Sequence, residues 1–268
     1  MYGAILGDII GSPYEFDREG KTKEFELFLP ESRFTDDSVL TIAVADALLR
    51  AKATFVLDDE GEVKDLLVNA MHKWGQQYPR AGYGGKFYKW LMFGGRDPYN
   101  SLGNGSAMRV SAAGWMGEDL DHCRTLARWS AEVTHNHPEG IKGAESVASA
   151  IYLARTGSTK EAILEYVADE FGYDLDRTCD EIRPGYQFDV TCQGSVPEAI
   201  IAFGEGKDFE DVVRTAVSLG GDADTIGAMA GSIGEAFYGV PEELKAECEA
   251  RLPGDMREVL REFAAKEM

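Results

Sequence analysis

Apolar residues recur along most of the chain at the spacing of amphipathic helices. Residues 35–51 follow the i, i+1, i+4, i+5 pattern of a helix that buries one face. The apolar positions of this segment are Val39, Leu40, Ala43, Val44, Ala47 and Leu48. Comparable periodicity runs through residues 62–74, 123–133, 139–155, 158–171, 197–206, 208–220, 243–252 and 255–266. Only short runs such as residues 188–192 could be strands, so the pattern predicts an all-α fold.

Residues typical of helix ends stand at the borders of these segments. Starts are marked by Ser158, Thr159, Asp208 and Pro241, and ends by Gly157, Gly172 and Gly220. No linker interrupts the pattern, so we expect one compact multi-helix domain over residues 1–268. Residues 75–105 are different, because they are rich in Gly, Tyr, Pro and Asn. They predict long loops around a short helix at residues 87–93, a typical setting for a functional site.

The composition of the chain argues against several classes of function. Acidic residues outnumber basic ones by 47 to 27, and no run of Lys and Arg occurs, so nucleic-acid binding is not expected. The 4 cysteines form no CxxC pair, so neither a disulfide framework nor a zinc site is indicated. A protein of a reducing compartment is expected. Residues 1–12 are apolar but contain Asp8, lack a basic flank and fall short of the ~20 residues that span a bilayer. We therefore expect a cytoplasmic protein that does not enter membranes.

The first candidate site is the acidic start of the helix at residues 35–51. Thr35 can act as an N-cap, and Asp36 and Asp37 would then lie in the first turn, where the helix dipole favours negative charge. Two adjacent carboxylates beside a hydroxyl are equally suitable ligands for Mg²⁺ or Ca²⁺. The segment taken alone leaves both explanations open.

The second candidate site is Gly220–Gly234, where Asp222, Asp224 and Thr225 precede a helix of small and apolar residues. A helix start with a capping aspartate explains the small residues as a packing surface. It does not explain two aspartates in so apolar a setting, because a buried carboxylate without a partner costs several kcal/mol. A cation is a suitable partner for both carboxylates.

Two known oxygen-ligand patterns do not fit this segment. An EF-hand loop starting at Asp222 would require Asp or Asn at Ile226 and Glu at Ile233. A DxDx[T/V] phosphatase motif would end at the same Ile226 and should follow a buried strand. We instead combine the two acidic segments into one split site. Together they offer four carboxylates and two hydroxyls, which could hold two Mg²⁺ ions with water or substrate completing the coordination.

The third candidate site is the glycine-rich part of the chain, at residues 80–85 and 100–115. Met108 occupies the last glycine position of a G-x-G-x-x-G pattern and no βαβ unit surrounds it, so a dinucleotide site of the Rossmann type is not expected. Small residues that lead into a helix can still present backbone N–H groups to a phosphate. His135 and His137 cluster at another helix start, without further His or Cys to complete a zinc site.

Five motifs follow one another in a recognisable order. They are GAILGDIIGSPYEF at residues 3–16, FTDDSVL at 34–40, GNGSAMRV at 103–110, THNHPEGIKGA at 134–144 and GGDADTIGAMAGSIGEAFYG at 220–239. With these motifs the chain resembles the ADP-ribosylglycohydrolase family, which includes the dinitrogenase-reductase-activating glycohydrolases and the ADP-ribosyl-acceptor hydrolases. The resemblance covers nearly the whole chain. It implies a compact all-α fold with two Mg²⁺ ions, or Mn²⁺, at the base of an ADP-ribose cleft.

The resemblance also implies roles for individual residues. The implied metal ligands are Thr35, Asp36, Asp37, Asp222, Asp224 and Thr225. The implied catalytic residues are Glu15, Asp37 and Asp222, with Glu15 as the acid, base or gating residue beside the metals. The implied ligand-binding residues are Gly82 and Gly84 at the ribose, Ser101, Gly103 and Asn104 at the diphosphate, and His135. Residues 188–199 are expected to border the adenine, without an assigned residue.

The implied reaction is metal-dependent hydrolysis of the bond between ribose C1″ and an acceptor atom, which releases ADP-ribose. The substrate would be an ADP-ribosylated protein or an ADP-ribose-containing small molecule, and we expect a monomer. Two other functions stay open at this point: a non-catalytic ADP-ribose-binding module, and a metal-dependent phosphohydrolase acting on a nucleotide or sugar phosphate. The acceptor depends on loops that the motifs do not specify.

Overall fold

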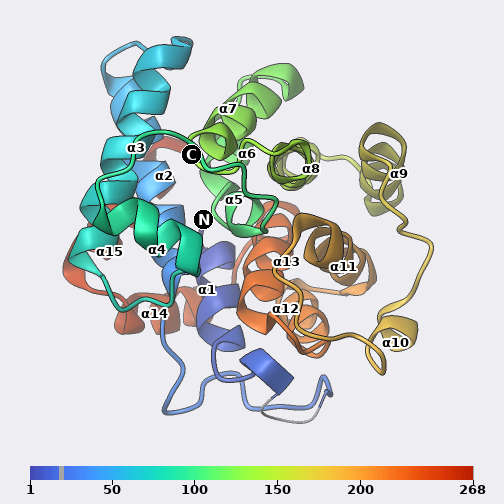
Figure 1. Ribbon diagram of the computed structural model, residues 1–268. Coiled ribbons are helices and arrows are strands. Elements are labelled where there is room, and N and C mark those ends of the chain that lie inside the picture. The colour runs from blue at the N-terminus through green and yellow to red at the C-terminus, as the bar shows by residue number, and fades with distance from the viewer. Residues whose placement is uncertain (18–20, 268) are drawn as a thin grey trace.

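The fold is given by a computed structural model that describes residues 1–17 and 21–267 (Figure 1). Across these residues the regular secondary structure is helical, with one isolated bridge between Gly103 and Thr191 and no strand. The all-α prediction is therefore confirmed. Residues 188–192 do not form the strand that their composition allowed, because no neighbouring strand pairs with them. None of the described helices combines the length and apolarity needed to cross a membrane.

The helices follow one another closely along the chain. They are α1 (Tyr2–Gly11), the 3-10 helix η1 (Glu15–Asp17), α2 (Asp36–Ala53), α3 (Glu60–Gln77), α4 (Gly85–Met92), α5 (Gly105–Met108), α6 (Ser111–Met116), α7 (Leu120–Glu132), α8 (Pro138–Arg155), α9 (Lys160–Phe171), α10 (Cys179–Ile182), α11 (Cys192–Glu205), α12 (Phe209–Val217), α13 (Ala223–Tyr238), α14 (Glu242–Arg251) and α15 (Gly254–Glu267).

The helix starts marked by Thr159, Asp208 and Pro241 coincide with observed N-caps, whereas the start at Pro197 does not. Thr159 and Asp208 accept capping hydrogen bonds at the starts of α9 and α12. The helix predicted from Pro197 begins earlier, at Cys192. The reason is that the Thr191 hydroxyl accepts a hydrogen bond from the Gly194 N–H at 3.1 Å, which caps α11 ahead of the proline.

Helices α1 and α13 lie antiparallel at the centre of the molecule, with backbone directly against backbone (Figure 1). A Cβ atom added at Gly7 would lie 2.0 Å from the Gly227 carbonyl oxygen, and one added at Gly3 would lie 2.1 Å from that of Gly231. No side chain larger than hydrogen fits at these points. The small residues of α13 thus form the packing surface that the sequence indicated.

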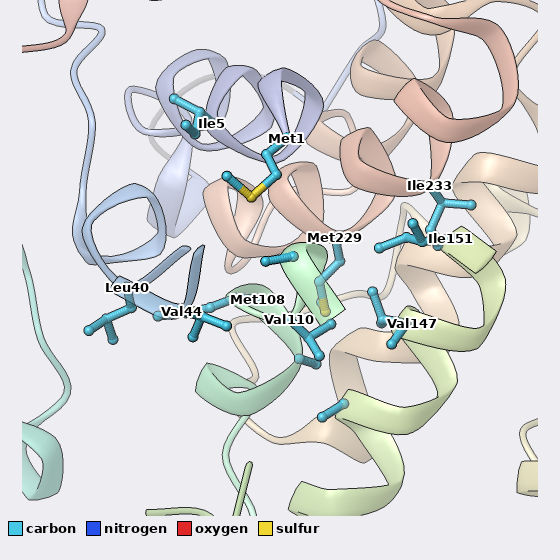
Figure 2. Packing of buried hydrophobic residues seen from close by; sticks show 14 of the residues in the cluster. Met1, Ile5, Leu40, Val44, Met108, Val110, Val147, Ile151, Met229 and Ile233 are labelled. Atoms are coloured by element: carbon cyan, nitrogen blue, oxygen red, sulfur yellow. The ribbon is translucent and has the colours of Figure 1, made fainter. Parts of the chain in front are cut away.

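Apolar side chains from α1, α2, α8, α13 and the α5–α6 region meet in the core that surrounds this helix pair (Figure 2). The apolar positions predicted for residues 35–51 are all buried. Figure 2 shows Ile5, Val44, Met108, Val147 and Met229 among the contributing side chains. The core therefore fixes α2 and α13 relative to α1.

The C-terminal half of α1 brings the two acidic segments together. A Cβ added at Gly11 would lie 2.5 Å from the Asp224 Cα, at the start of α13. One helical turn earlier, Asp8 accepts a hydrogen bond from the Thr35 N–H, at the start of α2. The N-termini of α2 and α13 consequently lie beside the same end of α1.

Candidate metal centre and ligand cleft

Asp8, a fully buried residue of α1, holds the start of α2. Its carboxylate accepts hydrogen bonds from the Thr35 N–H at 2.8 Å, the Thr35 hydroxyl at 2.7 Å and the Ser38 N–H at 3.0 Å, and another from the Ser38 hydroxyl. Helix N-termini leave N–H groups unpaired, so a carboxylate that accepts from two of them fixes the position of the helix. This role of Asp8 was not predicted from the sequence. The available signal was a single charged residue within an apolar helix.

The two threonine hydroxyls of the acidic segments both lie beside Asp37. Thr35 is the N-cap of α2, since its hydroxyl accepts from the Asp37 N–H at 3.4 Å. The Thr225 hydroxyl donates to Asp37 Oδ2 at 3.3 Å. The helix-start explanation of Thr35 is therefore correct for its backbone, and the same residue also lies in the acidic cluster.

Asp222 occupies the N-cap position of α13 but does not cap the helix. Its side chain makes no capping hydrogen bond and instead accepts from Asn104 Nδ2 at 2.6 Å. Gly220 and Gly221 precede it with φ of +73° and +66°, a left-handed turn that favours glycine. This turn directs the Asp222 carboxylate away from its own helix and toward the loop that carries Asn104.

Two groups of carboxylates are close enough to share cations. Asp8, Asp37 and Asp224 form one group, and Glu15, Asp222 and Asp224 form the other. Within each group, one oxygen from every residue lies within 4.8 Å of the others. Asp224 belongs to both groups and therefore lies between the two candidate positions.

An unpartnered oxygen supports a cation at this cluster. Asp37 Oδ1 is buried and has no hydrogen-bond partner among the described residues. A buried carboxylate oxygen without a partner is costly, and a cation would provide one. The nearby donors are carboxylate and hydroxyl oxygens, with no sulfur or imidazole nitrogen in either group. This donor chemistry suits Mg²⁺ or Mn²⁺ better than zinc.

The protonation of the cluster shows how strongly the carboxylates affect one another. Burial, followed by the charge of Asp8, raises the pKa of Asp36 to about 8. Burial, together with neighbouring carboxylates, also raises the pKa values of Asp37 and Asp224 well above their ordinary range. Such mutual effects are expected where several carboxylates are buried together, as in a cation-binding site.

A cleft of about 480 Å³ opens over this cluster. It is lined by nearly all the site residues that the sequence predicted. Those that line it are Glu15, Asp36, Asp37, Gly82, Gly84, Ser101, Gly103, Asn104, His135, Asp222, Asp224 and Thr225. Thr35 does not line the cleft, because its side chain is bonded to Asp8. Asp36 lines it but belongs to neither carboxylate group; the loop at Gly82, where φ is +116°, packs beside its Oδ1.

The loop before α5 is held by its own backbone amides. The Gly103 N–H donates to Ser101 Oγ at 3.1 Å and the Asn104 N–H donates to the Val190 carbonyl at 2.8 Å. These two amides are engaged within the protein, so a phosphate site built from loop N–H groups stays a prediction that would involve other amides of residues 100–115. The loop still shapes the cleft wall. His137, which sequence analysis grouped with His135, caps α8 by accepting from the Glu139 N–H.

Several cleft residues were not predicted from the sequence. Phe16 and Phe188 pair across the opening with ring centroids 4.6 Å apart, and both side chains are partly exposed. Lys86 and Arg109 line the cleft and bring positive charge to it. The signal for Phe188 was its place in residues 188–199, which were expected to border the ligand. The only signal for Arg109 in the sequence was its place in the GNGSAMRV motif.

Comparisons with known proteins identify the family of this chain. A model of the ADP-ribosylglycohydrolase family matches residues 1–268. The ADP-ribosylhydrolase ARH3 of Mus musculus is 30% identical over 329 residues, covering 93% of this chain and 86% of the mouse protein. The ADP-ribosylarginine hydrolase Tri1 of Pseudomonas putida (strain GB-1) is 25% identical, covering 90% of this chain and 70% of Tri1.

The comparison of folds supports the same family. A solved structure of an ADP-ribosylglycohydrolase-related protein complex superimposes with a TM-score of 0.65 and 26% sequence identity, over 100% of this chain and 97% of the other. The family match, the relatives and the fold all extend over nearly the full length described above. The chain belongs to the ADP-ribosylglycohydrolase family and is a hydrolase of glycosidic bonds.

Proposed function

We propose that this enzyme hydrolyses the bond between ribose C1″ of an ADP-ribosyl group and its acceptor atom, releasing ADP-ribose, with two Mg²⁺ or Mn²⁺ ions as cofactors. One observation carries the proposal. Asp37 and Asp224, from distant parts of the chain, belong to one carboxylate group at the cleft, and Asp37 keeps a buried oxygen without a partner. The names of the relatives ARH3 and Tri1 support the choice of an ADP-ribosyl substrate.

The residues that would hold the cations come from the two helix starts. They are Thr35, Asp36, Asp37, Asp222, Asp224 and Thr225. The Thr35 and Thr225 hydroxyls donate their protons to carboxylates. The Thr225 oxygen would therefore offer its lone pairs to a cation, and the Thr35 oxygen, which also accepts from the Asp37 N–H, would offer one. When bound, Mg²⁺ supplies positive charge that polarises ligand oxygens and lowers the pKa of water.

The carboxylates of the chain have their own part in the reaction. Glycoside hydrolysis passes through a transition state with oxocarbenium character, and nearby carboxylates such as those of Asp37 and Asp222 stabilise the developing positive charge. Glu15 lines the cleft and shares a carboxylate group with Asp222 and Asp224. It would either protonate the leaving group or remove a proton from the attacking water.

The charges in the cleft suggest how ADP-ribose would lie. The acidic cluster suits the ribose that carries the scissile bond, with Gly82 and Gly84 beside it. Lys86 and Arg109 offer positive charge to the diphosphate, near Ser101 and Asn104.

A substrate panel tests the proposal. The protein is incubated with ADP-ribosyl-arginine, ADP-ribosyl-serine and free ADP-ribose, each with and without Mg²⁺, and the products are separated by chromatography. Mg²⁺-dependent release of intact ADP-ribose from a conjugate is the expected result, and the conjugate that reacts identifies the acceptor. Release of AMP or phosphate would favour a phosphohydrolase. Binding of ADP-ribose without any release would favour a binding module.

A further inference from the structure

A hydrogen bond between Tyr78 and Asp255 ties the end of α3 to the start of α15. The Tyr78 hydroxyl lies 2.7 Å from Asp255 Oδ1 and 2.9 Å from Oδ2, and it donates to this carboxylate. Gln77, the last residue of α3, donates to the same carboxylate. Burial, followed by the hydrogen bond to Asp255, raises the pKa of Tyr78 above its ordinary value, so the hydroxyl keeps its proton and remains a donor. The end of α3 is thus held by a residue 177 positions later in the chain.

The turn that follows Tyr78 leads directly to Asp36. The Ala81 N–H donates to the Tyr78 carbonyl at 3.2 Å, which closes the turn. The Ala81 carbonyl in turn accepts from the Asp36 N–H at 2.9 Å. This N–H lies in the first turn of α2, where the helix itself offers no carbonyl to accept from it. The turn therefore supplies the partner that holds the Asp36 backbone in place.

Two further contacts strengthen the link between this turn and the acidic start of α2. The Tyr78 ring packs edge to face against Phe34, which precedes the acidic segment, with ring centroids 5.6 Å apart. Gly82 lies so close to Asp36 that an added Cβ would be 3.1 Å from Asp36 Oδ1. Residues 78–82 thus contact the segment just before Asp36, at its backbone and at its side chain. The position of this turn decides where the Asp36 carboxylate can lie.

Asp36 has particular need of such support. It lines the cleft but belongs to neither group of carboxylates that are close enough to share a cation. We propose that Tyr78 and Asp255 are positioning residues of the metal centre, which act through the turn at residues 78–82 to hold Asp36 where its carboxylate can bind a cation. The statement about the cation rests on the proposed function, whereas the statement about the turn does not. A loose turn would give Asp36 more conformations, of which a cation could bind only a fraction, and affinity would fall accordingly.

Amide hydrogen exchange tests the anchoring in the full chain without added divalent cations. Tyr78→Phe keeps the aromatic ring but removes the bond to Asp255. We expect the Asp36 N–H to exchange about tenfold faster in this variant, the effect of one hydrogen bond. The Val44 N–H, in the buried middle of α2, should exchange at the wild-type rate, which separates local loosening from loss of overall stability. Tyr88→Phe is the matched control, because it removes a hydroxyl from a side chain of α4 that is 43% exposed.

Titration calorimetry with Mg²⁺ tests the consequence for cation binding. Tyr78→Phe and Asp255→Ala should each weaken Mg²⁺ affinity by about tenfold, since residues that orient metal ligands contribute about 10- to 100-fold. The double variant should stay within about twofold of the single ones, because both substitutions remove the same hydrogen bond. Tyr88→Phe should bind Mg²⁺ like the wild-type protein.

The outcomes separate this proposal from the proposed function. An unchanged exchange rate for Asp36 in Tyr78→Phe, or an increase no larger than that for Val44, would overturn the proposal. Wild-type Mg²⁺ affinity in Tyr78→Phe, or additive losses in the double variant, would overturn its cation part. If the wild-type protein itself binds no Mg²⁺, the proposed cofactor is wrong, while the exchange rates still decide whether Tyr78 and Asp255 hold Asp36.

Discussion

The Thr225 hydroxyl donates a hydrogen bond to Asp37 Oδ2 at 3.3 Å, although the two residues are 188 positions apart in the chain. The contact joins the N-termini of α13 and α2, whose acidic residues would repel each other in the absence of a balancing charge. The folded chain therefore holds together a set of carboxylates that tends to separate.

Asp224→Asn should remove cation binding while keeping the fold. The substitution retains the shape of the side chain but takes away the carboxylate that both groups share. We expect activity to fall by at least about 100-fold, since loss of residues that merely orient metal ligands already costs about 10- to 100-fold. Isothermal titration with Mg²⁺ and circular dichroism measure binding and helix content. Asp169→Asn, at an exposed position of α9, is the matched control. Wild-type turnover by Asp224→Asn in Mg²⁺ would refute the two-cation assignment.

Removing divalent cations with a chelator should lower the thermal stability of the wild-type protein. A ligand that binds only the folded state at about 100 times its Kd adds about 2.7 kcal/mol. For a protein of this size the corresponding rise in Tm is about 5–10 °C. Scanning calorimetry with chelator, Mg²⁺ and Mn²⁺ measures it. Asp224→Asn should show little change between these conditions, and equal Tm values for the wild-type protein would contradict a cation site.

Gly7→Ala should destabilise the protein strongly. The new methyl group would lie 2.0 Å from the Gly227 carbonyl oxygen and force α1 and α13 apart. We expect a loss of about 3 kcal/mol or more in the free energy of unfolding, measured by urea denaturation. Gly61→Ala in α3 is the control, because its Cβ would meet no atom closer than 3.4 Å. That variant should gain about 0.5–1 kcal/mol, and similar stabilities for the two would show that α1 and α13 are less closely packed than described.

Asp46 should make stability depend on pH in the acidic range. Burial alone would raise the pKa of Asp46, but hydrogen bonds from Lys73, Trp74 and Arg50 outweigh it and lower the pKa below 3.8. A lowered folded-state pKa means that the stabilisation is complete above the unfolded-state value and is lost as the pH falls through the folded-state value. Asp46→Asn should therefore be less stable than wild type at pH 7, by urea denaturation, and the difference should shrink below about pH 4. A difference that stays constant down to pH 2 would contradict this.

Local signals in the sequence were sufficient to predict most helices. They were not sufficient for features that depend on contacts between residues far apart in the chain. Thr159 and Asp208 predicted helix starts because a cap depends only on the next few residues. Asp8 looked like a core residue, because its partners Thr35 and Ser38 are adjacent only after folding. Residues 188–192 have strand-like composition, yet a strand also needs a neighbour to pair with.

The candidate site also combines residues that the sequence indicated with residues that only the fold brings into it. The acidic motifs were visible from residue types, and their pairing rested on the family resemblance. Arg109 was not visible as a cleft residue, because its burial beside Thr134 follows only from the fold. No sequence pattern distinguishes such an arginine from a surface residue that pairs with solvent or a nearby carboxylate.

The backbone contact between α1 and α13 also bears on how the enzyme can change. Since not even a methyl group fits between Gly7 and Gly227, the packing of the two helices that carry Asp8 and Asp224 resists alteration by single substitutions. The exposed Phe16, Phe188 and Val190 at the opening face no such restriction, because their side chains project partly into solvent. Under the proposed function, acceptor preference can therefore change at the opening by ordinary mutation while the acidic cluster beneath stays the same.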